Sequence, residues 1–201
     1  MQETPSPITP RANRFAKAIA ITLLIVAITL IIGYLYDCIG NETFPKRYDI
    51  YIKKYAKMYG VPESVVYAVI KTESDFDMYA VSSSDPPAKG LMQITEETFK
   101  WVGGHLLKEN VNTLKIFDPE TNIRYGTYLL SYLYGRFENW NTVYAAYNAG
   151  MTRVNGWLKD PAYSDGNGNL TYIPFKETRA YVTKVAEYRI KYENQINNKN
   201  N

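Results

Sequence analysis

The sequence offers almost no cysteine or histidine chemistry. Its 201 residues include one cysteine, Cys38, and one histidine, His105. A lone cysteine can form neither an intramolecular disulfide nor a cysteine-based zinc site, and a Ser-His-Asp or Cys-His site would depend on His105 alone. The adjoining Gly103-Gly104 predicts a loop, and no nucleophile motif accompanies it. We therefore expect no metal site and no histidine-dependent nucleophile.

Charge is also scarce. Charged residues make up 21% of the chain and the net charge is +3, which is too weak to predict a nucleic-acid partner but would not repel an anionic polymer. Hydrophobic residues make up 46%, enough for the core of one domain with an appendage. The 19 tyrosines fit either a bias of composition or a surface that contacts carbohydrate.

One long apolar run lies near the N-terminus. Residues 18–36 carry no charge, Arg11, Arg14 and Lys17 precede them, and Asp37 follows. At about 1.5 Å per residue, a helix of this length spans the hydrocarbon core of roughly 30 Å. The basic flank predicts a cytoplasmic N-terminus and an extracytoplasmic remainder. We expect an uncleaved, single-pass signal anchor in the cell membrane.

Three alternatives to the anchor differ in how well they fit. A cleaved signal peptide is the main one, although no small-x-small cleavage site follows the run. Lipid attachment at Cys38 is disfavoured because Tyr36-Asp37 are not the small residues such a site has. A buried core helix fits least, since nothing in the run is amphipathic.

The chain therefore divides by composition. Residues 1–10 are polar and proline-rich, which predicts disorder. The predicted parts are a cytoplasmic basic tail (1–17), a transmembrane signal anchor (18–36), a linker (37–45), a globular domain (46–193) and a frayed polar tail (194–201).

The domain is predicted to be mostly helical. Apolar and tyrosine residues fall at helical spacing before Gly60, which suits a helix C-terminus. Residues 75–89 are rich in serine, aspartate and proline and predict a loop or short hairpin. Thr95, Asp118 and Asn141 are candidate N-caps of later helices. Residues 154–158 predict a short helix and the last helix begins near Glu177. Gly126 would let a neighbouring helix approach closely.

The most informative helix starts after Pro62 and carries Glu73 near its last turn. An apolar stripe that includes Val65 and Val69 predicts one buried face, and Glu73 falls at its edge. Partial burial and the negative end of the helix dipole both disfavour a charged carboxylate there. Glu73 should therefore hold its proton more tightly than a solvated glutamate, as a general acid must near neutral pH.

The segments around Glu73 resemble a known family. Glu73-Ser74-Asp75-Phe76, Ala80-Val81-Ser82 and Gly90-Leu91-Met92-Gln93 together resemble the catalytic core of lytic transglycosylases of the soluble type, relatives of goose-type lysozyme. The resemblance extends over about residues 44–192. It includes three later segments: Asp118-Pro119-Glu120-Thr121-Asn122-Ile123, Ala145-Ala146-Tyr147-Asn148-Ala149-Gly150 and Glu177-Thr178-Arg179-Ala180-Tyr181-Val182.

The resemblance implies an α+β, predominantly helical, lysozyme-like fold with a small β element beside the cleft. Glu73 would be the single catalytic acid/base. The residues implied to bind sugar or support the cleft are Ser82, Met92, Gln93, Tyr147, Asn148 and Tyr181. The chain departs from the family pattern by a short insertion between Ser82 and Gly90, by Pro87 where glycine is usual, and by Glu96 in place of a common proline.

The implied reaction cleaves the bond between N-acetylmuramic acid and N-acetylglucosamine in peptidoglycan and leaves a 1,6-anhydromuramic end, without metal or organic cofactor. The implied partners are peptidoglycan glycan strands and, through residues 18–36, the cytoplasmic membrane; which cell-wall or secretion-machinery proteins join them is left open. One alternative is a goose-type hydrolase, for which Asp75 and Asp85 are candidate second carboxylates. Another is a non-catalytic wall-binding module, which the intact motifs disfavour.

Overall fold

The structure is a computed structural model that describes residues 10–198. Within the first helix, side chains are described at residues 15, 17–35 and 43. The chain divides into two compact units, Met1–Pro45 and Lys46–Asn201, which we treat separately. The predicted disorder of residues 1–10 falls almost wholly outside the described residues.

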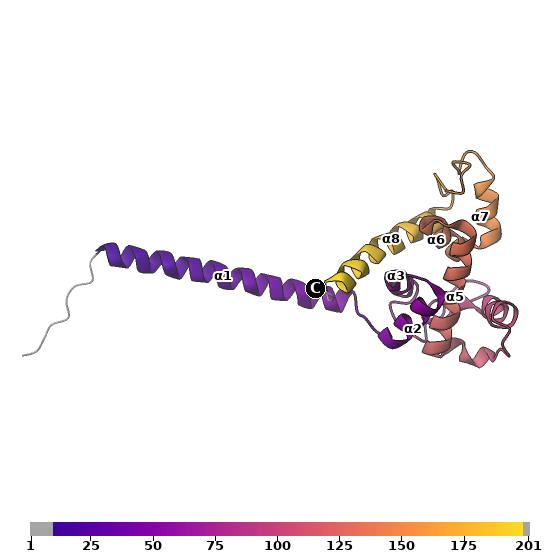
Figure 1. Ribbon diagram of the computed structural model, residues 1–201, viewed down its shortest axis with the longest axis horizontal. Coiled ribbons are helices and arrows are strands. Elements are labelled where there is room, and N and C mark those ends of the chain that lie inside the picture. The colour runs from indigo at the N-terminus through magenta and orange to yellow at the C-terminus, as the bar shows by residue number, and fades with distance from the viewer. Residues whose placement is uncertain (1–9, 199–201) are drawn as a thin grey trace, which may run out of the picture. The chain divides into compact units, whose positions relative to one another are not determined.

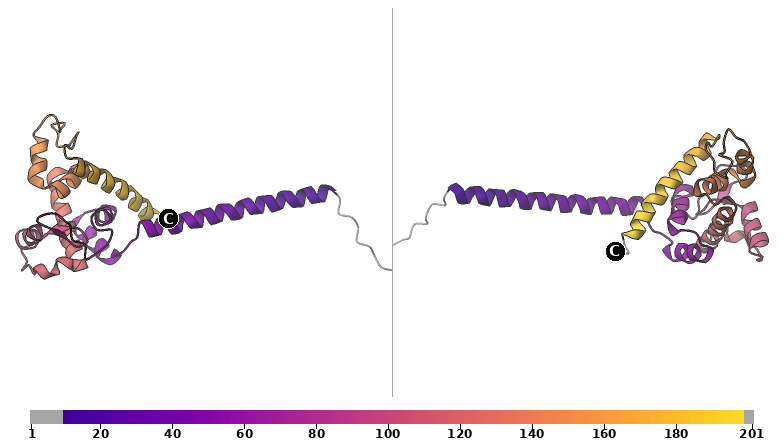
Figure 2. Two further views of the ribbon diagram at one scale, coloured as in Figure 1. Left: turned by 180° about the vertical axis from the view of Figure 1, so that it is seen from behind. Right: turned by 45° about the horizontal axis from the view of Figure 1, so that its top comes forward.

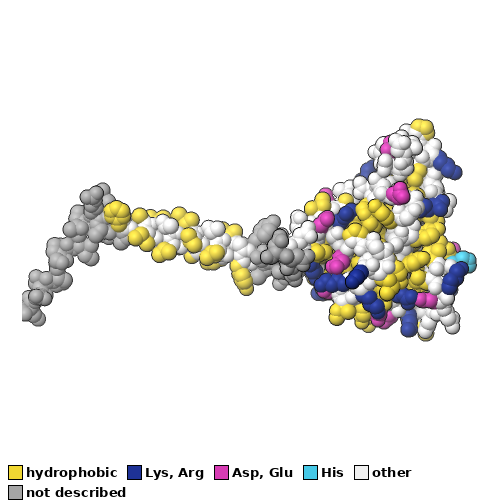
Figure 3. Space-filling model, viewed as in Figure 1, with side chains coloured by type: hydrophobic (Ala, Val, Ile, Leu, Met, Phe, Trp, Pro, Cys, Tyr) yellow, Lys and Arg dark blue, Asp and Glu magenta, His cyan; other side chains and the backbone are white. Residues whose placement is uncertain are grey.

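The first unit contains one helix, α1 (Pro10–Thr43). Its segment Lys17–Leu35 is fully exposed and is long and apolar enough to cross a membrane. Beyond Lys17, the described side chains of this segment are uncharged (Figure 3). Most of the predicted linker over 37–45 is helical, because α1 continues to Thr43.

The second unit is predominantly helical, with one small sheet (Figure 1). Its helices are α2 (Asp49–Tyr59), α3 (Glu63–Glu73), α4 (Glu96–Lys100), the π-helix η1 (Trp101–Leu106), the 3₁₀-helix η2 (Thr113–Phe117), α5 (Pro119–Phe137), α6 (Trp140–Ala149), α7 (Met151–Leu158) and α8 (Lys176–Asn197). Strand β1 (Ala88–Lys89) pairs antiparallel with β2 (Ile94–Thr95). The small β element expected beside the cleft is thus present, although it lies over 88–95 and not over 75–89, and the α+β, mainly helical class is confirmed.

Helix α3 lies at the centre of the packing. It contacts α8 and α2, while α5 contacts α2, α6, η1 and η2 (Figure 2). Every residue of 64–70 is buried. The predicted single apolar stripe was therefore too narrow, because neighbouring elements cover α3 on several sides rather than one.

Caps at several helix ends follow the predicted chemistry. Gly60 adopts φ 68° at the end of α2. Thr95 Oγ1 accepts a hydrogen bond from the Thr98 N–H at 3.2 Å, and Asp118 Oδ2 accepts one from the Thr121 N–H at 2.9 Å. The predicted Asn141 cap is wrong: Asn139 caps α6 by accepting from the Thr142 N–H at 3.1 Å.

Two other predictions are corrected by packing. Gly103-Gly104-His105 lies in η1 rather than in a loop. A side chain at Gly103 would lie 2.7 Å from the Tyr125 hydroxyl, so glycine lets this turn pack closely on α5. The last helix does not fray after Glu193 but continues to Asn197. Tyr192, fully buried and stacked on Tyr67 at 5.0 Å, fixes this end of α8.

Candidate active site

Glu73 is the last residue of α3, and α8 supplies its hydrogen-bond partner. The Tyr181 hydroxyl donates to Glu73 Oε1 at 2.7 Å. Burial raises the pKa of Glu73 to about 7, against smaller lowering effects of the Tyr181 hydrogen bond and the Lys184 charge. Burial wins because a carboxylate loses more hydration there than one donor replaces. The expected upward direction of the pKa is therefore found.

The Gly-Leu-Met-Gln segment, residues 90–93, forms a tight turn near this carboxyl. Gly90 has φ 77°, and a Cβ there would lie 2.4 Å from Asn122 Nδ2. The Met92 N–H donates to Asn122 Oδ1 at 2.8 Å, and Asn122 Nδ2 donates to the Ile116 carbonyl at 2.7 Å. Asn122, fully buried on α5, thus ties the segment to the domain core.

Gly126 makes a second close approach between α5 and this segment. A Cβ at Gly126 would lie 2.3 Å from Met92 Sδ. The sequence predicted that Gly126 lets a neighbouring helix approach. The structure shows instead that glycine is needed here to make room for the Met92 side chain. Met92 itself is fully buried. Its side chain does not line the cavity beside Glu73, so of the two implied roles, sugar contact or support of the cleft, its position favours support.

Tyr147 on α6 completes the support. Its hydroxyl donates to the Met92 carbonyl at 2.8 Å. Burial, with a smaller effect of the Glu73 charge, holds the pKa of Tyr147 well above 10, and the pKa of Tyr181 is raised in the same way. Both phenols are therefore neutral hydrogen-bond donors at neutral pH. Two segments distant in sequence, α6 and α8, thereby fix the site from one side.

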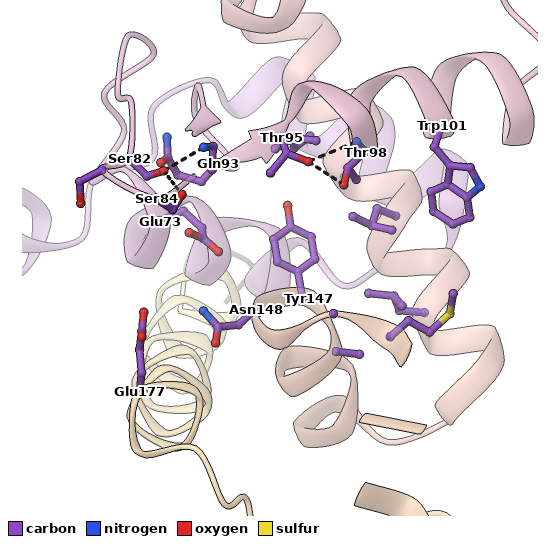
Figure 4. Close-up of a pocket in the computed structure, with 18 residues that line it drawn as sticks. Glu73, Ser82, Ser84, Gln93, Thr95, Thr98, Trp101, Tyr147, Asn148 and Glu177 are labelled. Carbon is purple, nitrogen blue, oxygen red and sulfur yellow. Dashed lines mark hydrogen bonds between the residues drawn. The ribbon is translucent and has the colours of Figure 1, made fainter. Parts of the chain in front are cut away.

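A cavity of about 500 Å³ opens beside Glu73. Four of the predicted residues, Ser82, Gln93, Tyr147 and Asn148, line it with Glu73 (Figure 4). Gln93 is held by hydrogen bonds from Nε2 to the Ala80 and Gly90 carbonyls, at 3.0 and 2.9 Å. Ser82 Oγ accepts from the Ala88 N–H at 2.8 Å. Tyr181 is not among the lining residues, so it contacts Glu73 from behind the cavity wall.

Other lining residues were missed. Thr95, Thr98 and Trp101 line the part of the cavity away from Glu73, and Glu177 lines the side formed by α8 (Figure 4). Thr95, Thr98 and Trp101 are spaced three residues apart, as residues on one helix face are. This spacing is the sequence signal that could have predicted them as a group. Glu177 belongs to the last motif-like segment but had no assigned role.

The two candidate second carboxylates, Asp75 and Asp85, differ in their position relative to Glu73. Asp75 is 72% exposed at its side chain and forms an ion pair with Lys71. It lines a second hollow that adjoins Glu73. Asp85 is exposed and lines neither hollow. Within residues 10–198, as far as their side chains are described, no group of three histidine, cysteine or acidic residues could hold a metal ion.

Comparison with known proteins identifies this arrangement. The family model described as "Transglycosylase SLT domain" matches residues 50–168. The chain belongs to this family. The match includes α3, the β hairpin, α5 and α6, and it ends before the Tyr181 segment.

Individual members agree with this assignment. The soluble lytic murein transglycosylase of Escherichia coli K12 is 36% identical over 170 residues, covering 81% of this chain and 25% of the relative. The membrane-bound lytic murein transglycosylase C of Serratia proteamaculans is 34% identical over 159 residues, covering 67% of this chain and 43% of the relative. The crystal structure of the 70-kDa soluble lytic transglycosylase from E. coli superposes with a TM-score of 0.70 at 35% identity, covering 83% of this chain and 27% of that one.

The lysozyme-like fold of this family is therefore the fold of the second unit. This chain spans about a quarter of the length of the soluble relatives that it matches.

Proposed function

We propose that this SLT-family chain is a peptidoglycan lytic transglycosylase that uses Glu73 as its single general acid/base. The observation that carries the proposal is the state of Glu73. Its carboxyl lines a cavity, its pKa is about 7, and a neutral tyrosine donates a hydrogen bond to one of its oxygens. Such a group is partly protonated at neutral pH and can both give and take a proton.

In the first step Glu73 protonates the glycosidic oxygen between N-acetylmuramic acid and N-acetylglucosamine. With Tyr181 bonded to Oε1, the proton to be transferred sits on the other oxygen. The bond from the anomeric carbon to the leaving oxygen breaks, and the acetamido oxygen of the muramic sugar attacks that carbon. This neighbouring group takes the place of a second protein carboxylate.

In the second step Glu73, now a carboxylate, removes the proton from the muramic 6-hydroxyl. That oxygen attacks the anomeric carbon and releases the acetamido group, which gives the 1,6-anhydro end and restores the protonated glutamate. No water is consumed. The chain's own contribution is to bury Glu73, orient it through Tyr181 and hold the sugar in place.

Ser82, Gln93 and Asn148 are proposed to contact the sugars directly, since all three line the cavity. Tyr147 lines it too, and its hydroxyl also holds the Met92 carbonyl. Met92 and Tyr181 are proposed as positioning residues. Met92 acts through its backbone carbonyl, which Tyr147 holds, and Tyr181 acts through its hydrogen bond to Glu73. Metal and organic cofactors have no part in the proposed steps.

Hydrolysis of the same bond is the second candidate, because Glu177 brings another carboxyl to the cavity. A hydrolase needs such a group to activate water. Asp75 offers a weaker case, since it is largely exposed and paired with Lys71.

The test is to incubate the full chain in detergent with purified peptidoglycan and to identify the released fragments by mass spectrometry. Anhydro ends that disappear in Glu73→Gln are expected. Reducing ends that depend on Glu73 and Glu177 would favour the hydrolase. Binding with no release by the wild type would contradict both and favour a non-catalytic wall-binding module.

The site must then face the cell wall. We propose that residues 18–36 anchor the chain in the cytoplasmic membrane, with residues 1–17 in the cytoplasm and the domain from residue 46 outside. The apolar helix and the basic residues before it support this orientation. Protease added to intact spheroplasts should degrade the domain; full protection that ends on lysis would contradict the orientation.

A further inference from the structure

A second hollow adjoins the cavity described above at Glu73. It measures about 540 Å³ and is lined by residues that include Lys71, Asp75 and Lys184. Glu73, Ser82, Ser83 and Gln93 line both hollows. Glu73 therefore stands where the two hollows meet, and a polymer cut at Glu73 would extend into both.

The two hollows differ in chemistry. The first is lined partly by apolar side chains such as Trp101, Leu129 and Met151, which suit the faces of sugar rings. Apart from Glu73, which both share, the charged residues that line the second are Lys71, Asp75 and Lys184. Unlike the first hollow, whose charged residues are Glu73 and Glu177, the second contains cationic side chains that can receive an anionic group.

The charges of the second hollow leave one cation in surplus. Lys71 is neutralised by its ion pair with Asp75. Glu73 is uncharged in the acid form that the proposed reaction requires. The remaining charge is the Lys184 ammonium, which is exposed on α8 and lies 5.6 Å from the centre of the Tyr188 ring. The surplus favours an anionic ligand.

The chemistry of the polymer restricts what that ligand is. In a peptide-bearing strand the lactyl carboxyl of each muramic sugar is in amide linkage to the peptide, so the sugars are neutral and the free carboxylates lie on the peptides. A carboxylate beside an ammonium forms a charge-assisted hydrogen bond. Ser82 and Ser83 line the same hollow and add neutral hydrogen-bonding groups.

We propose that the second hollow binds a carboxylate of the peptide attached to the glycan strand, with Lys184 as its counter-ion. The proposal rests on the proposed function, because it takes peptidoglycan as the ligand. It makes Lys184 a specificity-determining residue that distinguishes strands with peptides from bare strands.

The test measures binding in the full chain carrying Glu73→Gln, which prevents turnover and removes any effect of Lys184 through the charge of Glu73. Soluble strands are prepared in three forms: with peptides, with the peptide carboxylates amidated, and with the peptides removed by an amidase and the muramic lactyl carboxylates that this exposes converted to amides. Adding Lys184→Gln should raise the Kd for peptide-bearing strands by up to about fivefold, the upper end of the range for one solvated ion pair. The Kd for the two substrates without free carboxylates should not change.

Two further variants are matched controls. Lys57→Gln removes the same charge from an exposed position on α2 that lines neither hollow, and it should leave every Kd unchanged. Lys184→Arg keeps the charge and should restore most of the discrimination. An equal effect of Lys184→Gln on all three substrates, or no effect on any, would overturn the proposal. If the wild type releases no product from peptidoglycan, the proposed function is contradicted, but the binding result still stands.

Discussion

Opposing influences on one carboxyl set the chemistry at the scale of single residues. Burial raises the pKa of Glu73, while the Tyr181 hydroxyl and the Lys184 ammonium lower it. The balance, a pKa of about 7, makes both protonation states available near neutral pH. A glutamate with the ordinary pKa would be almost wholly ionised there and would be a poor acid.

Replacing Tyr181 by phenylalanine should change this balance in a known direction. The hydroxyl bonds to the charged form of Glu73, so its removal should raise the pKa of Glu73 and move the alkaline limb of kcat/KM to higher pH by about one unit. The measurement is a pH profile of fragment release. Tyr51→Phe on α2 is the control. An unmoved limb, or one moved to lower pH, would show that the hydrogen bond does not stabilise the carboxylate.

Glu73 should also reduce the stability of the fold at high pH. Its folded pKa of about 7 lies above the ordinary glutamate pKa of 4.5, so the folded state binds the proton more tightly. The stability conferred by the protonated group is therefore lost as the pH rises from about 4.5 to 7. The free energy of unfolding of Glu73→Gln should exceed that of the wild type by roughly 1–3 kcal/mol at pH 8, allowing for partial solvation. At pH 4.5 the two should differ little.

Urea unfolding of residues 46–201 at both pH values measures this difference. Glu97→Gln, at an exposed site on α4, should show no such dependence. A Gln variant that is less stable than the wild type at pH 8 would contradict the account.

The sequence predicted some of these residue-level features. A carboxyl at the edge of a buried stripe in a last helical turn must be poorly hydrated, so the direction of the Glu73 pKa followed from local pattern. The Tyr181 hydrogen bond joins residues 108 positions apart, and only the family resemblance brought them together. Local pattern also could not reveal that the Met92 side chain faces Gly126 rather than the cleft.

At the scale of elements, the site depends on how α5 and α6 hold the Gly-Leu-Met-Gln segment. Asn122 bonds the segment's backbone from α5, and Tyr147 bonds it from α6. Capping chemistry is local, so Thr95 and Asp118 were predicted correctly from sequence. The π-helix η1 was not, because its glycine is needed for contact with Tyr125, which lies far along the chain.

Gly126→Ala tests the contact between α5 and this segment. The added Cβ would meet Met92 Sδ at 2.3 Å, so the segment or the helix must shift. We expect a loss of about 1–3 kcal/mol in the free energy of unfolding, typical of overpacking. Gly156→Ala is the matched control in α7, where nothing lies within 4 Å of the added carbon. Equal stability of the two variants in urea would contradict the close approach.

At the scale of the whole molecule, the chain combines an exposed apolar helix with a domain that has its own core. The described residues of 18–35 are all exposed, which an aqueous environment would not favour over such a length. The domain mixes both signs of charge on its surface, as Figure 3 shows for one face. The composition of the sequence predicted this division, although it did not predict that the helix continues through most of the supposed linker.

The double substitution Leu24→Arg with Ile28→Arg tests the membrane assignment. Each arginine near the helix centre costs about 2.5–3.5 kcal/mol on insertion. The full chain should therefore move from the carbonate-washed membrane pellet to the soluble fraction. Leu24→Ile with Ile28→Leu keeps the hydropathy and should remain in the pellet. Retention of the arginine variant in the pellet would contradict anchoring by this helix.

The most direct test of the central claim is to digest peptidoglycan with the full chain in water enriched in oxygen-18. The account predicts fragments whose new ends are anhydro ends with no heavy oxygen, because the muramic 6-hydroxyl and not water closes on the anomeric carbon. The same reaction with Glu73→Gln should release nothing. New ends that carry heavy oxygen would show that water attacks, and would contradict a transglycosylase with Glu73 as its single acid/base.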